Sequence, residues 1–210
     1  GNGGGSVTAV YQLTTGLNSY VLATGWGVGA WSAGAWSSST AITLSNQLRL
    51  FSQDAFGDDL IFNPRAGGVF FWDKSAGLST RAVDISTLSG ASNTPTAALQ
   101  VMVSDIDRHV ICFGANSIGG SDLDPLLVRW SDQENVADWT PTATNSAGGQ
   151  VLSVGTQIIG ALKTRQEIII STDNGLTSMR FVGAPFVFSF TPVAEHVRFA
   201  SPSAAVVAAD

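Results

Sequence analysis

The segment HVICFG, residues 109–114, decides the fold class. Its centre is a continuous run of four apolar residues, which is short for a helix and typical of a β-strand buried on both faces. Residues 59–63 (DLIFN) and residues 167–172 (EIIIST) have the same character. No long stripe of apolar residues at helical spacing accompanies any of them. The sequence therefore predicts an all-β protein.

Each of these apolar segments is the second of four short strand-like runs. The three resulting units span residues 47–86, 98–144 and 156–192. The expected runs are QLRLFSQ, DLIFN, VFFWD and STRAVDI in the first unit, ALQVMVSDIDR, HVICFG, LLVRWSD and DWTPTAT in the second, and TQIIGALKTR, EIIIST, LTSMRF and FVFSFTP in the third. Four-stranded repeats that start roughly 50–60 residues apart favour a β-propeller, with one antiparallel sheet per blade. The alternative is a β-sandwich with similar hairpins.

The N-terminal part, residues 1–46, has a different character. We expect two strands there, at residues 7–13 and 19–23, followed by a loop arm rich in Gly and Trp. At the other end, residues 203–210 (SAAVVAAD) are typical of the first strand of a further unit. This pattern predicts that the chain is an excerpt of a longer protein.

Trp26, Trp31 and Trp36 are the candidate interface residues of the arm. They are spaced five apart, which matches neither the period of a strand nor that of a helix. Tryptophan is enriched among the residues that anchor protein interfaces. One interpretation is therefore a contact arm for a neighbouring subunit, and the other is an insert that packs on its own domain.

The charge of the chain is low and acidic. Charged residues are 12% of the sequence, about half the usual share of roughly 25%. The formal net charge is −6, and the only lysines are Lys74 and Lys163. This balance argues against a protein that grips nucleic-acid phosphates, which needs a basic patch. A weakly charged surface suits a subunit that buries much of itself against neighbours.

Few residues offer catalytic or metal chemistry. The two histidines, His109 and His196, belong to no metal-binding pattern, and the single cysteine, Cys112, excludes an intrachain disulfide framework and a cysteine-rich zinc site. Since Cys112 lies in an apolar strand, we interpret it as a small buried side chain. We expect no catalytic residue, no cofactor and no metal.

Three close pairs of aspartates are the alternative to that expectation. They are Asp58 with Asp59, Asp105 with Asp107, and Asp122 with Asp124. Aspartate caps its own backbone in tight turns, which explains all three pairs. The alternatives are a structural calcium ion at the third pair and a carboxylate pair of a glycan-degrading enzyme formed by the first two.

Residues 129–190 and residues 48–73 resemble the virion structural proteins of tailed bacteriophages, in particular the family of tail tubular protein B, or nozzle proteins. The resemblance spans roughly residues 25–210 and includes the Gly/Trp segment. It implies a propeller-bearing subunit that forms a cyclic ring, a hexamer, and assembles with adaptor and tail fibre or tip proteins.

The same resemblance implies a location in the phage tail, where duplex DNA passes through the ring during ejection without specific binding. Contact with the host envelope is then indirect. The family has no catalytic residues to transfer, and its chains are usually several times longer than 210 residues. The main alternative is a propeller module that binds carbohydrate or a receptor, with the three tryptophans stacking on sugar rings. A lectin propeller would repeat such a set in each blade, whereas this set occurs once.

Overall fold

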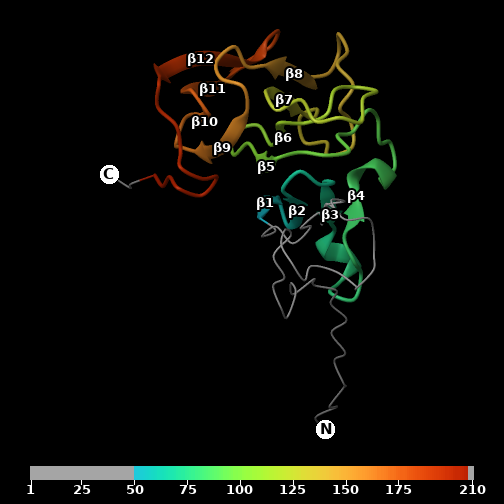
Figure 1. Cartoon of the computed structure of the whole chain (residues 1–210). Coiled ribbons are helices and arrows are strands. Elements are labelled where there is room, and N and C mark those ends of the chain that lie inside the picture. The colour runs from blue at the N-terminus through green and yellow to red at the C-terminus, as the bar shows by residue number, and fades with distance from the viewer. Residues whose placement is uncertain (1–49, 208–210) are drawn as a thin grey trace, which may run out of the picture. The chain divides into compact units, whose positions relative to one another are not determined.

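The computed structural model describes residues 50–207. The chain divides into a unit Gly1–Leu48 and a unit Arg49–Asp210, and the description concerns the second. Residues 50–207 form twelve strands and two short 3-10 turns, η1 (Lys74–Ala76) and η2 (Ile85–Thr87) (Figure 1). The strands are β1 (Phe51–Phe56), β2 (Asp59–Pro64), β3 (Phe70–Trp72), β4 (Val83–Asp84), β5 (Gln100–Val103), β6 (Val110–Phe113), β7 (Leu127–Trp130), β8 (Gly148–Val151), β9 (Ile158–Lys163), β10 (Ile168–Thr172), β11 (Gly175–Gly183) and β12 (Val187–Glu195).

The twelve strands make three antiparallel sheets of four strands each. Within each sheet the strands lie in chain order, from β1 to β4, from β5 to β8 and from β9 to β12. The predicted all-β class and the predicted four-stranded antiparallel sheets are confirmed. Among the described residues the three sheets close into no barrel or ring.

The second sheet is buried on both faces, and β6 shows why. All four of its residues are buried. Val110 and Cys112 belong to an apolar core shared with the first sheet, whereas Ile111 and Phe113 belong to a core shared with the third. Because side chains alternate between the faces of a strand, a continuous apolar run can fill two cores at once. The sheets therefore pack in the order first, second, third.

The first strands of the sheets meet at one recurring structural position. In each sheet, one residue of the first strand pairs with the fifth residue of the apolar segment that contains the second strand. These apolar segments are residues 59–63, 109–114 and 167–172. These pairs are Ser52 with Asn63, Gln100 with Phe113, and Gly160 with Ser171. Each of these first-strand residues also contacts the part of the chain that follows its own sheet. We call this contact the inter-sheet joint.

The first two joints are hydrogen bonds from side chains to the next first strand. Ser52 Oγ accepts a hydrogen bond from Val101 N at 2.8 Å. Gln100 accepts one from Ala161 N at 2.8 Å and donates one to Ala161 O at 2.9 Å. These bonds satisfy main-chain groups at the sheet edges, which would otherwise be unpaired. They place β1, β5 and β9 side by side.

The third joint is a close contact over the face of the third sheet that is turned away from the second. A Cβ on Gly160 would lie 2.9 Å from both Cα and O of Pro202, so the chain passes where a larger residue would stand. Close by, Phe199 N donates a hydrogen bond of 2.9 Å to Ser171 Oγ. Residues 203–207, predicted to begin a further strand, contain no strand.

The fourth strand of the second sheet was predicted wrongly. It was expected at residues 138–144 (DWTPTAT) but is β8, whose Gly148 pairs with Trp130 of β7. Pro141 has no N–H for a ladder, and Asp138 accepts hydrogen bonds from Ser92 Oγ and Thr140 N, which hold this segment as a loop. The predicted N-terminal strands, at residues 7–13 and 19–23, lie outside the described residues.

Candidate functional site

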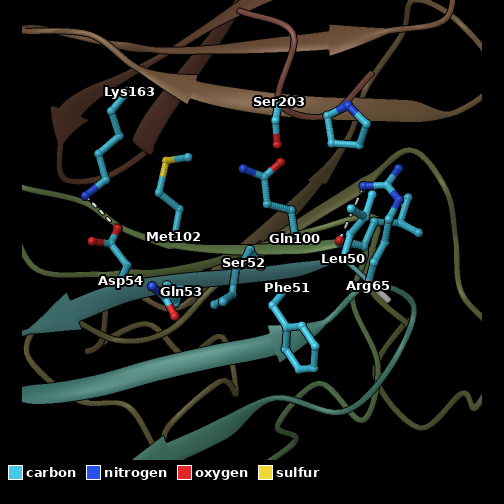
Figure 2. A pocket seen from close by; sticks show the side chains of 13 residues that line it. Leu50, Phe51, Ser52, Gln53, Asp54, Arg65, Gln100, Met102, Lys163 and Ser203 are labelled. Atoms are coloured by element: carbon cyan, nitrogen blue, oxygen red, sulfur yellow. Dashed lines mark hydrogen bonds and ion pairs between the residues drawn. The ribbon is translucent and has the colours of Figure 1, made fainter. Parts of the chain in front are cut away.

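A cavity lies where the first strands of the three sheets meet, with a volume of about 430 Å³ (Figure 2). Its lining comes from β1, β5 and β9, the turn after β2, and the C-terminal segment. The lining residues are Leu50, Phe51, Ser52, Gln53, Asp54, Arg65, Leu99, Gln100, Val101, Met102, Lys163, Pro202 and Ser203. Figure 2 shows Lys163 and Asp54 at one end of the cavity, Arg65 at the other, and Gln100 between them.

One end of the cavity holds an ion cluster that ties the three sheets together. Lys163 Nζ of β9 lies 2.6 Å from Asp54 Oδ2 of β1 and 2.8 Å from Asp105 Oδ1 in the turn between β5 and β6. Partial burial lowers the pKa of Lys163, but the hydrogen bonds and charges of Asp105 and Asp54 outweigh it and leave this pKa above its ordinary value. Lys163 is therefore a charged cross-link and not a neutral amine nucleophile.

The other end of the cavity holds the half-buried Arg65. Its guanidinium makes two long contacts with main-chain carbonyls, at 3.4 Å to Leu99 O and at 3.4 Å to Ile158 O. Among residues 50–207 no carboxylate forms an ion pair with it. Burial lowers the pKa of Arg65, but the guanidinium still carries its charge at neutral pH because its ordinary pKa is so high.

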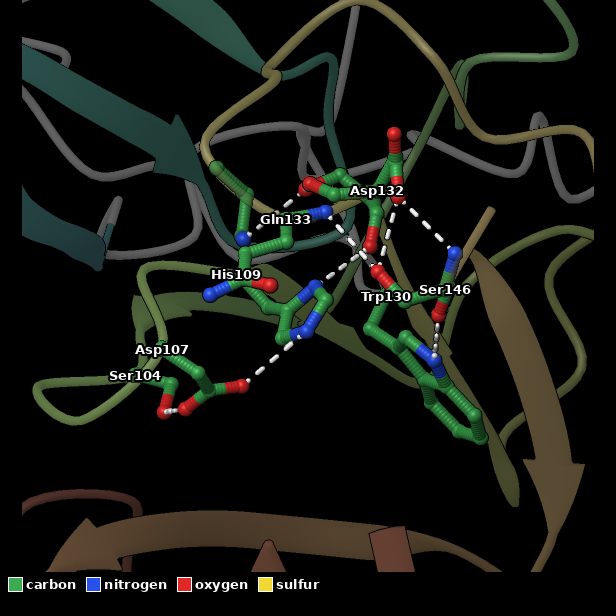
Figure 3. A network of polar contacts seen from close by, with 9 residues as sticks. Ser104, Asp107, His109, Trp130, Asp132, Gln133 and Ser146 are labelled. Atoms are coloured by element: carbon green, nitrogen blue, oxygen red, sulfur yellow. Dashed lines mark hydrogen bonds and ion pairs between the residues drawn. The ribbon is translucent and has the colours of Figure 1, made fainter. Parts of the chain in front are cut away.

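A second polar cluster, formed by Ser104, Asp107 and His109, is buried at the end of β6 (Figure 3). Ser104 Oγ donates a hydrogen bond to Asp107 Oδ1. His109 Nε2 lies 3.0 Å from Asp107 Oδ2, and the ring's Nδ1 lies 2.7 Å from Ser131 O. Because a carbonyl oxygen only accepts hydrogen bonds, Nδ1 carries a proton. The Nε2–Oδ2 contact lacks the alignment of a hydrogen bond.

This cluster holds the second and third sheets together and does not resemble a nucleophilic triad. Ser104 contacts the carboxylate and not the imidazole, whereas a catalytic serine is hydrogen-bonded to the histidine. The ring of His109 packs against Phe181 and Phe188 of the third sheet, with centroid distances of 6.2 and 5.4 Å. No side of the imidazole is left open for a substrate, since it is fully buried.

The end of β7 is fixed by a neighbouring network around Asp132 and Ser146 (Figure 3). Asp132 Oδ1 accepts hydrogen bonds from Ser146 N at 2.8 Å and from Ser146 Oγ at 2.7 Å. Trp130 Nε1 donates to Ser146 O at 2.8 Å. Burial alone would raise the pKa of Asp132, but the hydrogen bonds from Ser146 hold it below its ordinary value.

The first and third aspartate pairs make local contacts. Asp58 forms an ion pair of 2.9 Å with Lys74, and Asp59 Oδ1 accepts a hydrogen bond from Lys74 N at 3.0 Å. Asp124 Oδ1 accepts one from Leu126 N at 3.0 Å, which is the turn chemistry expected for it. Within residues 50–207 no three His, Cys, Asp or Glu residues group in a way that could hold a metal ion.

The other residues named from the sequence have three different outcomes. Cys112 is fully buried, and burial raises the pKa of its thiol to about 12, so it is no nucleophile at neutral pH. His196 is exposed. The candidate interface residues Trp26, Trp31 and Trp36 lie outside the described residues.

Sequence reasoning missed the residues that shape the cavity. Arg65 and Gln100 gave no signal, because their role depends on where distant strands meet. The alternation of Ser52 and Asp54 with outward-facing residues of β1 was the one available hint, since polar side chains on an inward face need partners.

No protein-family model, no curated protein and no solved structure matches the chain. Neither 3-10 turn of the described part has the length or the apolar character of a helix that crosses a membrane. The fold and the site therefore define an all-β protein of three stacked four-stranded sheets with a polar cavity at their common edge.

Proposed function

We propose that the chain is a structural subunit of a bacteriophage tail, of the nozzle or tail-tube kind, and that it lines part of the DNA ejection channel. The sequence resemblance of residues 48–73 and 129–190 is the origin of the proposal. The observation that carries it furthest is the succession of three four-stranded antiparallel sheets whose first strands lie side by side. A repeating all-β body of this kind is a rigid wall element, since each sheet buries apolar surface against the next.

The sheets are best interpreted as blades of a β-propeller. In a two-sheet sandwich each sheet has one inner and one outer face. The second sheet here has a core on each side, with Val101 and Cys112 in one and Ile111 and Phe113 in the other. Such packing supports a series of blades over a sandwich.

The subunit would assemble with copies of itself into a cyclic ring, and a hexamer follows from the family resemblance. Apolar side chains along the β11–β12 hairpin fit such an interface: Val182 is 52% exposed, Phe186 77% and Val193 58%. Residues 181–194 contain no charged side chain, and depletion of charge is typical of interface centres. Adaptor and tail fibre or tip proteins would be the further partners, with the host envelope contacted indirectly.

The acidic surplus suits a channel wall. A net charge of −6 gives duplex DNA few counterion-releasing contacts, so DNA would pass without specific binding. We assign no catalytic role and no cofactor, because the carboxylates considered for glycan cleavage are occupied by Lys74, Lys163 and His109.

A carbohydrate- or receptor-binding module is the second candidate, and the polar cavity beside Arg65 is the observation that favours it. Ligand pockets are concave and combine apolar walls with a few placed polar groups. A glycan-degrading enzyme is the lesser candidate, since it would need two free carboxylates across a cleft.

The decisive measurement is the mass and symmetry of the particle formed by the natural full-length protein, by light scattering and negative-stain imaging. We expect a closed ring with a central channel wide enough for duplex DNA. A monomer at micromolar concentration would contradict the proposal. Binding of that monomer to immobilised glycans would then support the second candidate.

A further inference from the structure

We propose that the cavity at the joined first strands binds a small organic carboxylate that carries hydroxyl groups, as a sugar acid does, with Arg65 as the anchor for the carboxylate. The proposal concerns residues 50–207 alone and does not depend on ring formation. It starts from the cavity volume of about 430 Å³, which lies within the range of roughly 300–1,000 Å³ found for ligand pockets.

Arg65 has hydrogen-bonding capacity that the fold leaves unused. A guanidinium carries five N–H donors in a rigid planar fork. The two contacts at 3.4 Å, to Leu99 O and Ile158 O, use two of them weakly. Arg65 lines the cavity, and its fork matches the two oxygens of a carboxylate.

The charges around the cavity set the orientation of the ligand. Lys163 lies within 2.8 Å of two carboxylates, those of Asp54 and Asp105, so this end of the cavity has a surplus of negative charge. The opposite end carries the positive charge of Arg65 with no acidic partner among residues 50–207. A ligand carboxylate therefore lies at Arg65, with the rest of the molecule extending toward Lys163.

Ser203 can recognise a hydroxyl group of the ligand. It lines the cavity and is exposed, and Figure 2 shows its side chain beside Gln100, near the middle of the cavity. Ser52 and Gln100, by contrast, are engaged in the inter-sheet joints. A serine hydroxyl offers one donor and two acceptor lone pairs, which suits a hydroxylated ligand.

The same charges select against phosphate. A phosphate dianion is usually held by several cations or a row of main-chain N–H groups. Among residues 50–207 this cavity has one cation without an acidic partner, Arg65, and the carboxylates of Asp54 and Asp105 lie at its other end. A carboxylate monoanion is the better match in charge and in geometry.

The test uses isothermal titration calorimetry with D-galacturonate, D-galactose and inorganic phosphate on the natural chain and three variants. We expect galacturonate to bind at millimolar concentrations or below and galactose not to bind. Arg65→Gln should weaken galacturonate binding at least tenfold, because it removes a charged bidentate partner. Arg81→Gln, at an exposed arginine that does not line the cavity, should leave the affinity unchanged.

Ser203→Ala provides a variant at an exposed position of the cavity lining, where folding is not at risk. It should weaken galacturonate binding several-fold, and circular dichroism would verify that each variant is folded. Should Arg65→Gln fail to fold, Arg65→Lys keeps the charge but loses the fork and should bind several-fold more weakly. No binding of galacturonate, equal binding of galactose, or Arg65-dependent binding of phosphate with equal affinity would each overturn the proposal.

Discussion

Removal of the Asp107 carboxylate should destabilise the protein strongly. In the native state the side chain of Asp107 is 2% exposed and that of its partner His109 is 0% exposed, so water can replace neither partner. Asp107→Ala leaves the imidazole with a proton on the buried Nε2 or with an empty acceptor there, and it deprives Ser104 Oγ of its acceptor. A buried polar group that loses its partner costs about 1–3 kcal/mol, so the loss of partners at His109 Nε2 and Ser104 Oγ together should cost about 2–6 kcal/mol.

This loss is large against a typical unfolding free energy of roughly 5–15 kcal/mol. In a domain of this size each kcal/mol lowers Tm by about 2–4 °C, so the expected drop is about 4–24 °C. Thermal and urea unfolding at pH 7, followed by circular dichroism, would measure it. The matched control is Asp58→Ala, which breaks an ion pair whose side chains are 60% and 81% exposed and should cost less than about 1 kcal/mol.

A double variant separates the pair from the packing around it. Asp107→Ala combined with His109→Leu leaves no orphaned polar ring between Phe181 and Phe188, so it should recover a large part of the lost stability. If Asp107→Ala is no more destabilising than Asp58→Ala, the buried pair does not hold the second and third sheets together, and the assignment is wrong.

Three further predictions concern other parts of the fold. Hydrogen bonds from serine hydroxyls hold the pKa values of Asp138 and Glu167 below their ordinary values. The stabilisation from these two carboxylates is therefore complete above the unfolded-state pKa and is lost as the pH falls through the folded-state pKa. Their contribution to the unfolding free energy, measured by urea titration, should be constant from about pH 5 to 7 and should decline below about pH 4; an increase of stability in acid would contradict this. The thiol of Cys112, with a pKa of about 12, should not react with a disulfide-exchange reagent at pH 8 until urea unfolds the chain; rapid labelling of the native protein would show that it is accessible. Gly148→Ala would place a methyl group 2.6 Å from the indole of Trp130 and should cost about 1–3 kcal/mol, measured by tryptophan fluorescence during urea unfolding; a stability equal to that of the natural chain would refute the close approach.

The sequence predicts the strands that are defined by local composition. The continuous apolar runs in β2, β6 and β10 are the second strands of their sheets, as predicted. The prediction fails at β8, whose Gly148 and Gly149 have the composition of a turn. Gly148 occurs in a strand because the ring of Trp130 occupies the space of a side chain, and a contact of that kind cannot be read from local composition.

The candidate site was less predictable, for a similar reason. Asp105 and Asp107 appear as one turn in the sequence, yet the first binds Lys163 from another sheet and the second binds His109 inside the core. Asp105 and Asp107 are only two residues apart in the sequence, yet the contact of Asp105 lies at the surface and that of Asp107 is buried. Only the packing of three distant sheets decides which partner each carboxylate finds, so no spacing rule could assign them.

The third inter-sheet joint gives the strongest physical reason to regard the sheets as blades of a series. On the first sheet, Asn63 donates a hydrogen bond to Ala98 O at 2.7 Å, and Val101, three residues further on, contacts Ser52. On the third sheet, Ser171 takes the place of Asn63 and accepts a hydrogen bond from Phe199 N. Gly160 takes the place of Ser52 and lies against Pro202, again three residues further along the chain.

Residues 199–202 therefore follow the same course over the third sheet that residues 98–101 follow over the first. The outer face of the third sheet receives the chain as the first sheet receives β5. In a stack of repeats each unit buries the face left by the one before it, whereas in a sandwich the outer face of a sheet meets water. The repetition of the joint at the outer face of the third sheet therefore supports the proposed series of blades, on grounds independent of the sequence resemblance.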